Sequence, residues 1–419
     1  MNKEKFDCAV FNFWASNNYG GLLTCYALCE TIKKLNYKPL VVKLYKPQTD
    51  RIDNFAKKYL NVTEKTYNQV NIAELNKFVE TFIVGSDCVF APEFYIKSFL
   101  LDFVNGDKKK ISYAPSFGQK FFNGSYNLKN IFNYYLEKFD FLSVRELSGV
   151  DLCKKEFNLN ATQVMDPVFL LDKNDYINLI ETKDENDTND VSHYLFKPDE
   201  YTDVMLQELE QNFGNNVCNI NMKVSDISLS QWLSNIKNSK FLLTQSFHGA
   251  CFAIIFNIPF VFAGRESFDT GRIESVLEIL GLQNRIIDYN GTFDSRPDLF
   301  EPIDWDRVNS ILEKEKERSI KWLKEALEAP KDLSKVNPAD AIIQSLNNKI
   351  ISLEYSNSQK IATEDIFDVL NYKKNYSKYL KNKILKNFVF GKTRTRYKEK
   401  QKIYHERVRK VRVLKKRFN

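Results

Sequence analysis

The chain has 419 residues, of which 43% are hydrophobic, and its 33 Phe and 21 Tyr supply enough bulk for more than one core. Its seven cysteines form no CxxC pair and it has three histidines, so nothing indicates a zinc ribbon, a redox dithiol or a His-rich metal site, and we expect neither a metal nor a cofactor. No apolar run approaches the roughly 18 residues that span a bilayer, and the opening MNKEKFDCAVFNF lacks the architecture of a signal peptide. We therefore expect a cytoplasmic protein.

The charge is divided unevenly along the chain. Residues 371–419 carry 19 Lys and Arg against 2 Glu, whereas the first 370 residues carry 42 basic and 52 acidic side chains. A mildly acidic body is therefore followed by a strongly basic tail, and the two need separate interpretations.

Strands and helices alternate through the first 165 residues. The pattern predicts a strand at 6–14, the turn NNYGG, a helix at 22–37 and a second strand at 39–45. A strand, a Gly-containing turn, a helix and a strand are how a parallel α/β domain begins. The later predicted elements are strands at 81–87, 109–116, 139–146 and 161–171 and a helix at 148–157.

The same rhythm returns in the second half, after a polar segment at 181–192 that we expect to be a surface loop. Two Rossmann-like domains of the α/β class, 1–165 and 166–330, with a crevice between them therefore fit the sequence, followed by a helical, basic extension at 331–419. The elements predicted in the second half are strands at 217–222, 240–246 and 259–264 and helices at 228–239, 247–257, 272–282 and 305–328.

Residues suited to binding a ligand follow the predicted strands of the first half. Open α/β sheets bind ligands at the carboxyl ends of their strands. In NNYGG, Asn18 offers an amide and Gly20 lets the backbone approach a ligand, although the same letters also suit an ordinary tight turn. In VGSD, Asp87 can position a sugar hydroxyl or act as a base, or it can cap the next segment. In SVRE, Arg145 can hold a carboxylate or phosphate through two hydrogen bonds, or pair with a neighbouring acid.

Further candidates lie where a strand of the second half turns into an apolar helix. Ser246 and His248 open this helix within TQSFHGACF, where N–H groups bind anions and a protonated imidazole can donate to one. A histidine beside apolar residues can equally be a core group with its hydrogen bonds satisfied. Arg265 and Arg272 follow within one strand and turn, so cationic groups gather in this half.

Seven segments, taken in order, resemble the polysaccharide pyruvyl transferase family. The resemblance runs from about residue 8 to about residue 328. It implies a pair of Rossmann-like domains of the glycosyltransferase-B type, with the active site between them. It also implies phosphoenolpyruvate as the donor and a pyruvate ketal on a hexose of a surface polysaccharide precursor as the product. The segments are NNYGGLLTCYAL, FIVGSDCVF, ISYAPSFG, FDFLSVRELSG, VMDPVFLL, TQSFHGACFAIIFNIPF and GRIESVLEILGL.

The resemblance also implies roles for individual residues. Arg145 matches a phosphoenolpyruvate-binding arginine, His248 is the best candidate for proton transfer, and Arg272 matches an arginine that precedes an apolar helix. We predict catalytic roles for His248, Arg145 and Asp87, and substrate binding by Arg272, Ser246, Asn18, Gly20 and Arg265.

Two other functions stay open at this point. A nucleotide-sugar glycosyltransferase on the same scaffold would release a nucleoside diphosphate in place of phosphate, and a non-catalytic member of a polysaccharide assembly complex would bind without turnover. The chain departs from the family pattern at Cys88 and Gln245, where glutamine and aspartate are common. These departures concern recognition of the acceptor more than the reaction itself.

The basic tail interleaves Lys and Arg with Tyr, Phe, Ile, Leu and Val. Such a composition is typical of a solvated charged helix, and it also suits a nucleic acid or a partner enzyme. We favour attachment to the anionic inner leaflet of the membrane, where a lipid-linked oligosaccharide acceptor would lie, over binding to nucleic acid.

Overall fold

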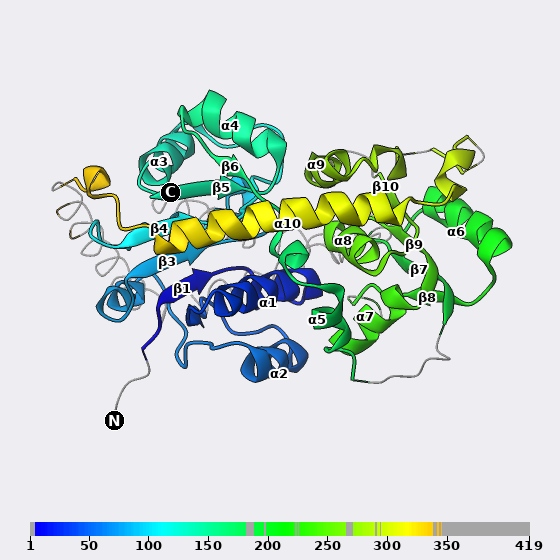
Figure 1. The fold of residues 1–419 in the computed structure, drawn as a ribbon, viewed down its shortest axis with the longest axis horizontal. Coiled ribbons are helices and arrows are strands. Elements are labelled where there is room, and N and C mark those ends of the chain that lie inside the picture. The colour runs from blue at the N-terminus through cyan, green and yellow to red at the C-terminus, as the bar shows by residue number, and fades with distance from the viewer. Residues whose placement is uncertain are drawn as a thin grey trace, which may run out of the picture. The chain divides into compact units, whose positions relative to one another are not determined.

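Two parallel β-sheets form the framework of the protein in the computed structural model (Figure 1). The predicted pair of Rossmann-like α/β domains is thereby confirmed. Most of the predicted extension at 331–419 falls outside the described part of the chain, as does Arg265. The structure describes residues 5–337, apart from 182–187, 197, 223, 225, 265–270, 290 and 294, together with residues 342 and 345.

The first sheet has six strands in the order β2-β1-β3-β4-β5-β6, and all neighbouring strands run parallel. Every residue of β1 and β4 is buried, as expected for parallel strands that are covered on both faces. The strands are β1 Cys8–Phe11, β2 Pro39–Val41, β3 Thr81–Val84, β4 Lys109–Ser112, β5 Phe141–Val144 and β6 Thr162–Gln163.

The second sheet has five strands in the order β11-β10-β9-β7-β8. Its strand β7 pairs with β8 on one side and β9 on the other, so the predicted loop at 181–192 is wrong from residue 189 onward. The prediction failed because β7 contains polar residues, which are typical of surface loops. In the structure such a residue is buried with a partner: the Ser192 hydroxyl donates to the Asn235 carbonyl 3.2 Å away. The strands are β7 Asn189–Tyr194, β8 Val217–Asn219, β9 Ser239–Thr244, β10 Phe260–Ala263 and β11 Ile286–Ile287.

Helices connect these strands, and two of them, α1 and α8, are buried almost throughout. Helix α8 is buried along its whole length, which is why its sequence is apolar on every face. The helices of the first half are α1 Tyr19–Lys34, α2 Asp50–Tyr59, α3 Tyr126–Leu136, α4 Leu147–Phe157 and α5 Lys173–Ile177. Those of the second half are α6 Glu200–Phe213, α7 Leu229–Lys237, α8 Phe247–Phe256, α9 Gly271–Leu280 and α10 Trp305–Glu328.

Both sheets belong to one unit of the structure, Met1–Gln344, and direct contacts join them. The Tyr19 hydroxyl at the start of α1 donates to the Ile227 carbonyl 2.7 Å away, and the Leu147 N–H at the start of α4 donates to Ser275 Oγ of α9 at 2.8 Å. The starts of α1 and α4 in the first half therefore contact the second half.

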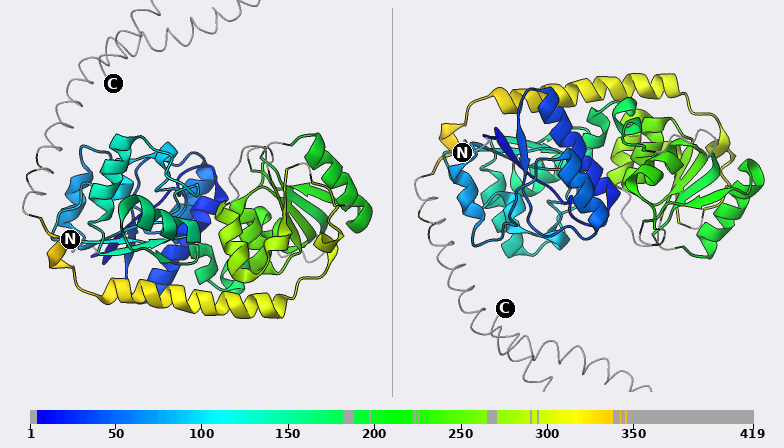
Figure 2. Two further views of the ribbon diagram at one scale, coloured as in Figure 1. Left: turned by 90° about the horizontal axis from the view of Figure 1, so that it is seen from above. Right: turned by 90° about the horizontal axis from the view of Figure 1, so that it is seen from below.

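Helix α10 ties the halves together a second time, and Figure 2 shows it running along both of them. Near its start, Arg307 donates to the Gly281 carbonyl after α9 at 3.0 Å. At its end, the Lys109 ammonium of β4 donates to the carbonyls of Leu327 and Ala329 at 2.5 and 2.7 Å. A cation is favourable at that end, because the last carbonyls of a helix lack partners within the helix.

Candidate active site

The loop after β3 brings an acid to the carboxyl edge of the first sheet. Gly85 permits this path, because a β-carbon at residue 85 would come within 1.9 Å of the Tyr113 carbonyl oxygen. The next two residues make hydrogen bonds to the loop after β4. Ser86 Oγ lies 2.7 Å from the Ala114 carbonyl oxygen, and the Asp87 carbonyl accepts from the Ser116 N–H at 2.8 Å. The Asp87 side chain remains 15% exposed.

Arg145 directly follows β5, and its guanidinium is surrounded by carboxylates, among them Asp87. Its Nε donates to Glu146 and its Nη1 to Asp166, both at 2.8 Å, while Asp87 Oδ1 lies 3.9 Å from Nη1. Burial alone would lower the pKa of this guanidinium, but the acids around it raise the pKa instead, so the group keeps its charge. The Arg145 guanidinium carbon lies 4.1 Å from the centroid of the Phe247 ring. Arg145 therefore forms ion pairs with neighbouring acids, which was one of the two possibilities raised by the sequence. Its Nη2 has no hydrogen-bond partner in the described structure.

Asp166 joins these groups and was not singled out from the sequence. It is fully buried: Oδ1 accepts from the Val168 N–H at 3.1 Å, and Oδ2 lies 2.8 Å from Arg145 Nη1 and 3.3 Å from Ser86 Oγ. Burial would raise the pKa of the Asp166 carboxyl, but His248 and Arg145 outweigh burial and lower it. Asp166 is therefore a carboxylate at neutral pH.

A signal for Asp166 was present in the sequence, as the one acid in the apolar run VMDPVFLL. The prediction of a strand across 161–171 is wrong there, because β6 is only two residues long and a 3-10 helix, η4 Pro167–Leu170, follows it. Asp166 caps that helix, and Pro167 suits its first position.

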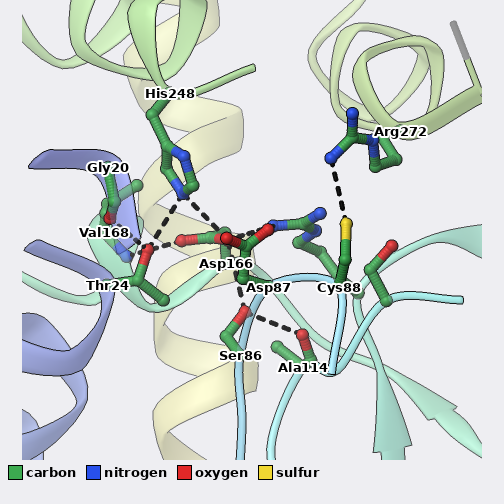
Figure 3. A network of polar contacts seen from close by, with 12 residues as sticks. Gly20, Thr24, Ser86, Asp87, Cys88, Ala114, Asp166, Val168, His248 and Arg272 are labelled. Carbon is green, nitrogen blue, oxygen red and sulfur yellow. Dashed lines mark hydrogen bonds and ion pairs between the residues drawn. The ribbon is translucent and has the colours of Figure 1, made fainter. Parts of the chain in front are cut away.

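His248 enters the cluster from the second half, in the first turn of α8. Ser246 begins this helix by accepting from the Gly249 N–H at 3.2 Å. The imidazole, in a residue that is 6% exposed, reaches across to α1, where His248 Nε2 lies 2.9 Å from Thr24 Oγ1 and 3.8 Å from Asp166 Oδ2 (Figure 3). Thr24 was not singled out either, because it lies within a helix and contacts a residue 224 positions away.

Arg272, in α9, also comes from this half, and it points toward the loop after β3 (Figure 3). Its Nη1 donates to Cys88 Sγ at 3.1 Å, and both residues are half-buried. Burial raises the pKa of the Cys88 thiol to about 11, so the group is protonated at neutral pH. Burial acts to raise the pKa of Asp87 too, but His248, Arg145 and Arg272 together lower it, so Asp87 is a carboxylate.

The other predicted site residues have structural partners. Asn18 caps α1 by accepting from the Gly20 N–H at 3.0 Å, and Ser246 caps α8. Gly20 packs against the imidazole of His248, since a β-carbon there would meet Nδ1 at 2.3 Å. Gln245, which stands at a position of departure from the family pattern, accepts from the Phe196 N–H at 2.9 Å.

The cluster therefore combines a reachable carboxylate, Asp87, with a histidine and Arg272 on the opposite half and a second carboxylate buried behind them. Such a set can bind an anion and move a proton. In the residues that the structure describes, no three His, Cys, Asp or Glu side chains are grouped to hold a metal ion. None of the described helices has the length and hydropathy to cross a membrane.

Comparisons with known proteins agree with the resemblance seen in the sequence. The family model described as "Polysaccharide pyruvyl transferase" matches residues 18–267. No curated protein matches the chain. Among solved structures, a glycosyltransferase from Rickettsia africae is similar at 10% identity and a TM-score of 0.47, over 82% of this chain and 99% of that one. Arabidopsis thaliana UGT89C1 complexed with UDP-L-rhamnose is similar at 8% identity and a TM-score of 0.48, over 77% and 99%. An uncharacterized protein from Klebsiella pneumoniae shares 16% identity at a TM-score of 0.39, over 67% and 92%.

Proposed function

The chain belongs to the polysaccharide pyruvyl transferase family, and we propose that it moves the enolpyruvyl group of phosphoenolpyruvate onto two hydroxyls of one hexose in a polysaccharide precursor, with release of phosphate. The observation that carries this proposal is the approach of His248 and Arg272 from one half to Asp87 and Cys88 on the other. These groups supply positive charge, a proton donor and a proton acceptor in one place.

The proposed reaction sets the requirements that the site must meet. Protonation of C3 of phosphoenolpyruvate turns C2 into an oxocarbenium-like electrophile. One sugar hydroxyl attacks C2, the bond from C2 to the phosphate oxygen breaks, and a second hydroxyl closes the ketal. Two hydroxyl protons are released in all: one balances the proton added to C3 and the other leaves with the phosphate. The protein must therefore hold an anion, donate one proton to carbon and accept protons from two hydroxyls.

His248 and the arginines fit the donor side of this scheme. An imidazole can donate a proton to carbon near neutral pH and take one back, since it is the side chain that titrates in that range. Arg272 is half-buried, so its guanidinium can reach a ligand, and it carries a charge that suits a carboxylate or a phosphate. Arg145 is fully buried and holds Glu146 and Asp166, so its positive charge would favour the anionic donor from behind these acids.

Asp87 fits the acceptor side. It is the carboxylate of the cluster that a substrate can touch, because Asp166 is fully buried whereas the Asp87 side chain is 15% exposed. The lowered pKa of Asp87 makes it an acceptor at neutral pH, so it would orient a sugar hydroxyl for attack. Asn18 is occupied as the cap of α1 and would contribute to the acceptor side by placing the first turn of that helix.

The acceptor in this proposal is a lipid-linked oligosaccharide, and the protein would work at the cytoplasmic face of a membrane. The support is the charge of the tail, 19 Lys and Arg against 2 Glu in residues 371–419, which suits an anionic leaflet. A protein held at that surface would meet its acceptor there.

The test is release of inorganic phosphate from phosphoenolpyruvate, measured with and without synthetic or lipid-linked hexose acceptors. We expect acceptor-dependent release by the wild type, and its loss in His248→Gln and Arg272→Met. His193→Gln is the matched control, since His193 is a histidine of β7 that makes no contact with the cluster in the described structure. If none of the tested sugars is the true acceptor, no phosphate will be released. Binding of phosphoenolpyruvate, measured by calorimetry, then tests the donor site without an acceptor. A chain that neither binds phosphoenolpyruvate nor releases phosphate, but frees nucleoside diphosphate from a nucleotide sugar, would be a glycosyltransferase instead.

A further inference from the structure

The hydroxyl of Thr24 has two close polar neighbours but only one proton. Thr24 Oγ1 lies 2.8 Å from the Gly20 carbonyl oxygen and 2.9 Å from His248 Nε2. A carbonyl oxygen can only accept, so the hydroxyl proton is needed for the bond to Gly20. The Thr24 oxygen then faces Nε2 with a lone pair, and the second bond forms if Nε2 carries a proton and donates it.

The opposite arrangement is unfavourable on two counts. If Thr24 donated to an unprotonated Nε2, its oxygen would face the Gly20 carbonyl at 2.8 Å with no proton between the two oxygens. The lone pair of Nε2 would also face Asp166 Oδ2 at 3.8 Å, and that carboxylate is fully buried. Repulsion of this kind is strongest away from water, where the effective dielectric constant is low.

Asp166 cannot turn away to relieve this repulsion, because its other contacts hold it. Its Oδ1 accepts from the Val168 N–H, and its Oδ2 accepts from Arg145. The negative oxygen therefore keeps its position below the imidazole, and it favours an N–H at the nitrogen that faces it.

We infer that Thr24 and Asp166 fix His248 with a proton on Nε2 in both of its charge states, so that Nδ1 is the nitrogen that gains and loses the proton. This inference rests on the proposed function only for its use in catalysis, since the tautomer itself can be observed without turnover. Thr24 and Asp166 are then positioning residues, and Nδ1, which makes no hydrogen bond in the described part of the chain, is left for the substrate.

The charged groups around His248 are consistent with this assignment. Asp166 lies on the Nε2 side, while Asp87 is the other carboxylate that interacts electrostatically with the imidazole. Arg145 is separated from His248 by Asp166, with which it pairs at 2.8 Å. Asp166 is thus the carboxylate that the structure places at the Nε2 side of the ring.

The same helix provides a matched control. Thr31 is buried in α1 and its Oγ1 donates to the Ala27 carbonyl at 2.8 Å, so it makes the same bond four residues back as Thr24 does. Among the residues that the structure describes, Thr31 has no histidine partner. Thr24→Val and Thr31→Val therefore remove the same local bond from one helix, and they differ in the contact with His248.

The experiment is long-range 1H–15N NMR of the full chain labelled at histidine, with the His248 signals identified by their loss in His248→Gln. We expect a neutral imidazole protonated at Nε2 in the wild type, in Thr24→Ser and in Thr31→Val, and a mixture of both forms in Thr24→Val. On acidification, the Nδ1 resonance should move from the unprotonated to the protonated position. A wild type protonated at Nδ1, or an unchanged tautomer in Thr24→Val, would overturn the inference.

Kinetics give a second readout that a purely structural role would not move. Thr24→Val should lower kcat for phosphate release on the order of tenfold or more and alter its pH profile, with Thr24→Ser restoring both and Thr31→Val leaving both unchanged. If the tautomer behaves as expected but no acceptor supports phosphate release and phosphoenolpyruvate does not bind, the proposed function fails while the positioning of His248 stands. If phosphate release is intact in Thr24→Val, the positioning role fails and the proposed function stands.

Discussion

The imidazole of His248 lies directly against Gly20, so that a β-carbon at residue 20 would come within 2.3 Å of Nδ1 and 2.5 Å of Cγ. The two residues belong to different halves of the protein, in the first turns of α1 and α8. Gly20 therefore provides the space in which a side chain of the second half reaches the carboxylates of the first. The glycine serves the histidine rather than a turn, since Gly20 is already helical.

Gly20→Ala should displace this imidazole and lower phosphate release on the order of tenfold or more. The loss would not come from a weaker helix, because alanine is favoured over glycine in a helix by roughly 1 kcal/mol. Gly21→Ala is the neighbouring comparison, since its new β-carbon would meet the Phe13 carbonyl at 3.2 Å and Asp87 Oδ2 at 3.9 Å but not the imidazole. Phosphate release and thermal unfolding of both variants check this. Full activity in Gly20→Ala would show that the imidazole need not occupy this place.

The two arginines of the cluster should respond differently to replacement by methionine. Arg145 is buried between Glu146 and Asp166, and its removal would leave their charges uncompensated. We expect Arg145→Met to lower the free energy of unfolding by about 3–5 kcal/mol. Arg272 is half-buried, so Arg272→Met should change stability by less than about 1 kcal/mol while weakening phosphoenolpyruvate binding. Urea unfolding and calorimetry distinguish the two, and equal destabilisation would contradict the difference in burial.

The strand ends were predictable from the sequence, and the side chains that meet there were partly so. Asp87 and Arg145 follow strands of the first sheet and lie together, because the carboxyl ends of parallel strands lie at one edge of a sheet. His248 follows a strand of the second sheet and reaches the same cluster across the contact between the halves. Their roles in the reaction stay predictions. Thr24 could not be found this way, since nothing in its helix distinguishes it from Thr31 except a contact with the other half.

Stability in acid should depend on Asp166. The pKa of its carboxyl is lowered in the folded protein from an ordinary value of 3.8, so the unfolded chain binds the proton more readily. The stabilisation is therefore fully present above that value and is lost as the pH falls toward and through the folded pKa. We expect the difference in unfolding free energy between wild type and Asp166→Asn to be largest near pH 7 and to shrink below about pH 4.

Asp102 supplies the opposite case for this measurement. Burial raises the pKa of its carboxyl, so ionisation there opposes folding above the ordinary carboxyl pKa. Asp102→Asn should therefore increase stability relative to wild type near pH 7, and the gain should disappear in acid. Urea unfolding at a series of pH values checks both variants, and a pH-independent effect of Asp166→Asn would be evidence against a buried carboxylate.

Cys88 should react slowly with iodoacetamide near neutral pH. The pKa of its thiol is about 11, so only about one thiol in a thousand is ionised at pH 8. The rate should rise about tenfold per pH unit up to that pKa, because the thiolate is the nucleophile. Phosphoenolpyruvate should slow the reaction, since Cys88 touches Arg272. Mass spectrometry of the Cys88 peptide measures this, and a rate that levels off near pH 8.5 would show an ordinary thiol.

The basic tail should hold the full chain on vesicles that contain anionic lipid. Residues 371–419 carry 19 Lys and Arg, and each basic residue near an anionic surface contributes about 1 kcal/mol. Binding should weaken steeply with salt, because the screening length falls from about 10 Å at 0.1 M to about 3 Å at 1 M. Sedimentation with phosphatidylserine-containing vesicles, compared with neutral phosphatidylcholine vesicles, measures the difference.

A change in net charge alone must be separated from a change in the tail. Replacing Lys381, Lys383, Lys386 and Lys392 by Gln removes four tail charges. Replacing four lysines of the body, Lys57, Lys65, Lys154 and Lys155, removes the same number from exposed positions. The two variants have equal net charges and differ only in the position of the lysines that are replaced. The tail variant should bind anionic vesicles more weakly than the body variant, because the tail is the segment that we expect to contact the lipid. Equal loss in both variants would point to the charge of the whole protein, and equal binding to neutral vesicles would rule out an electrostatic attachment.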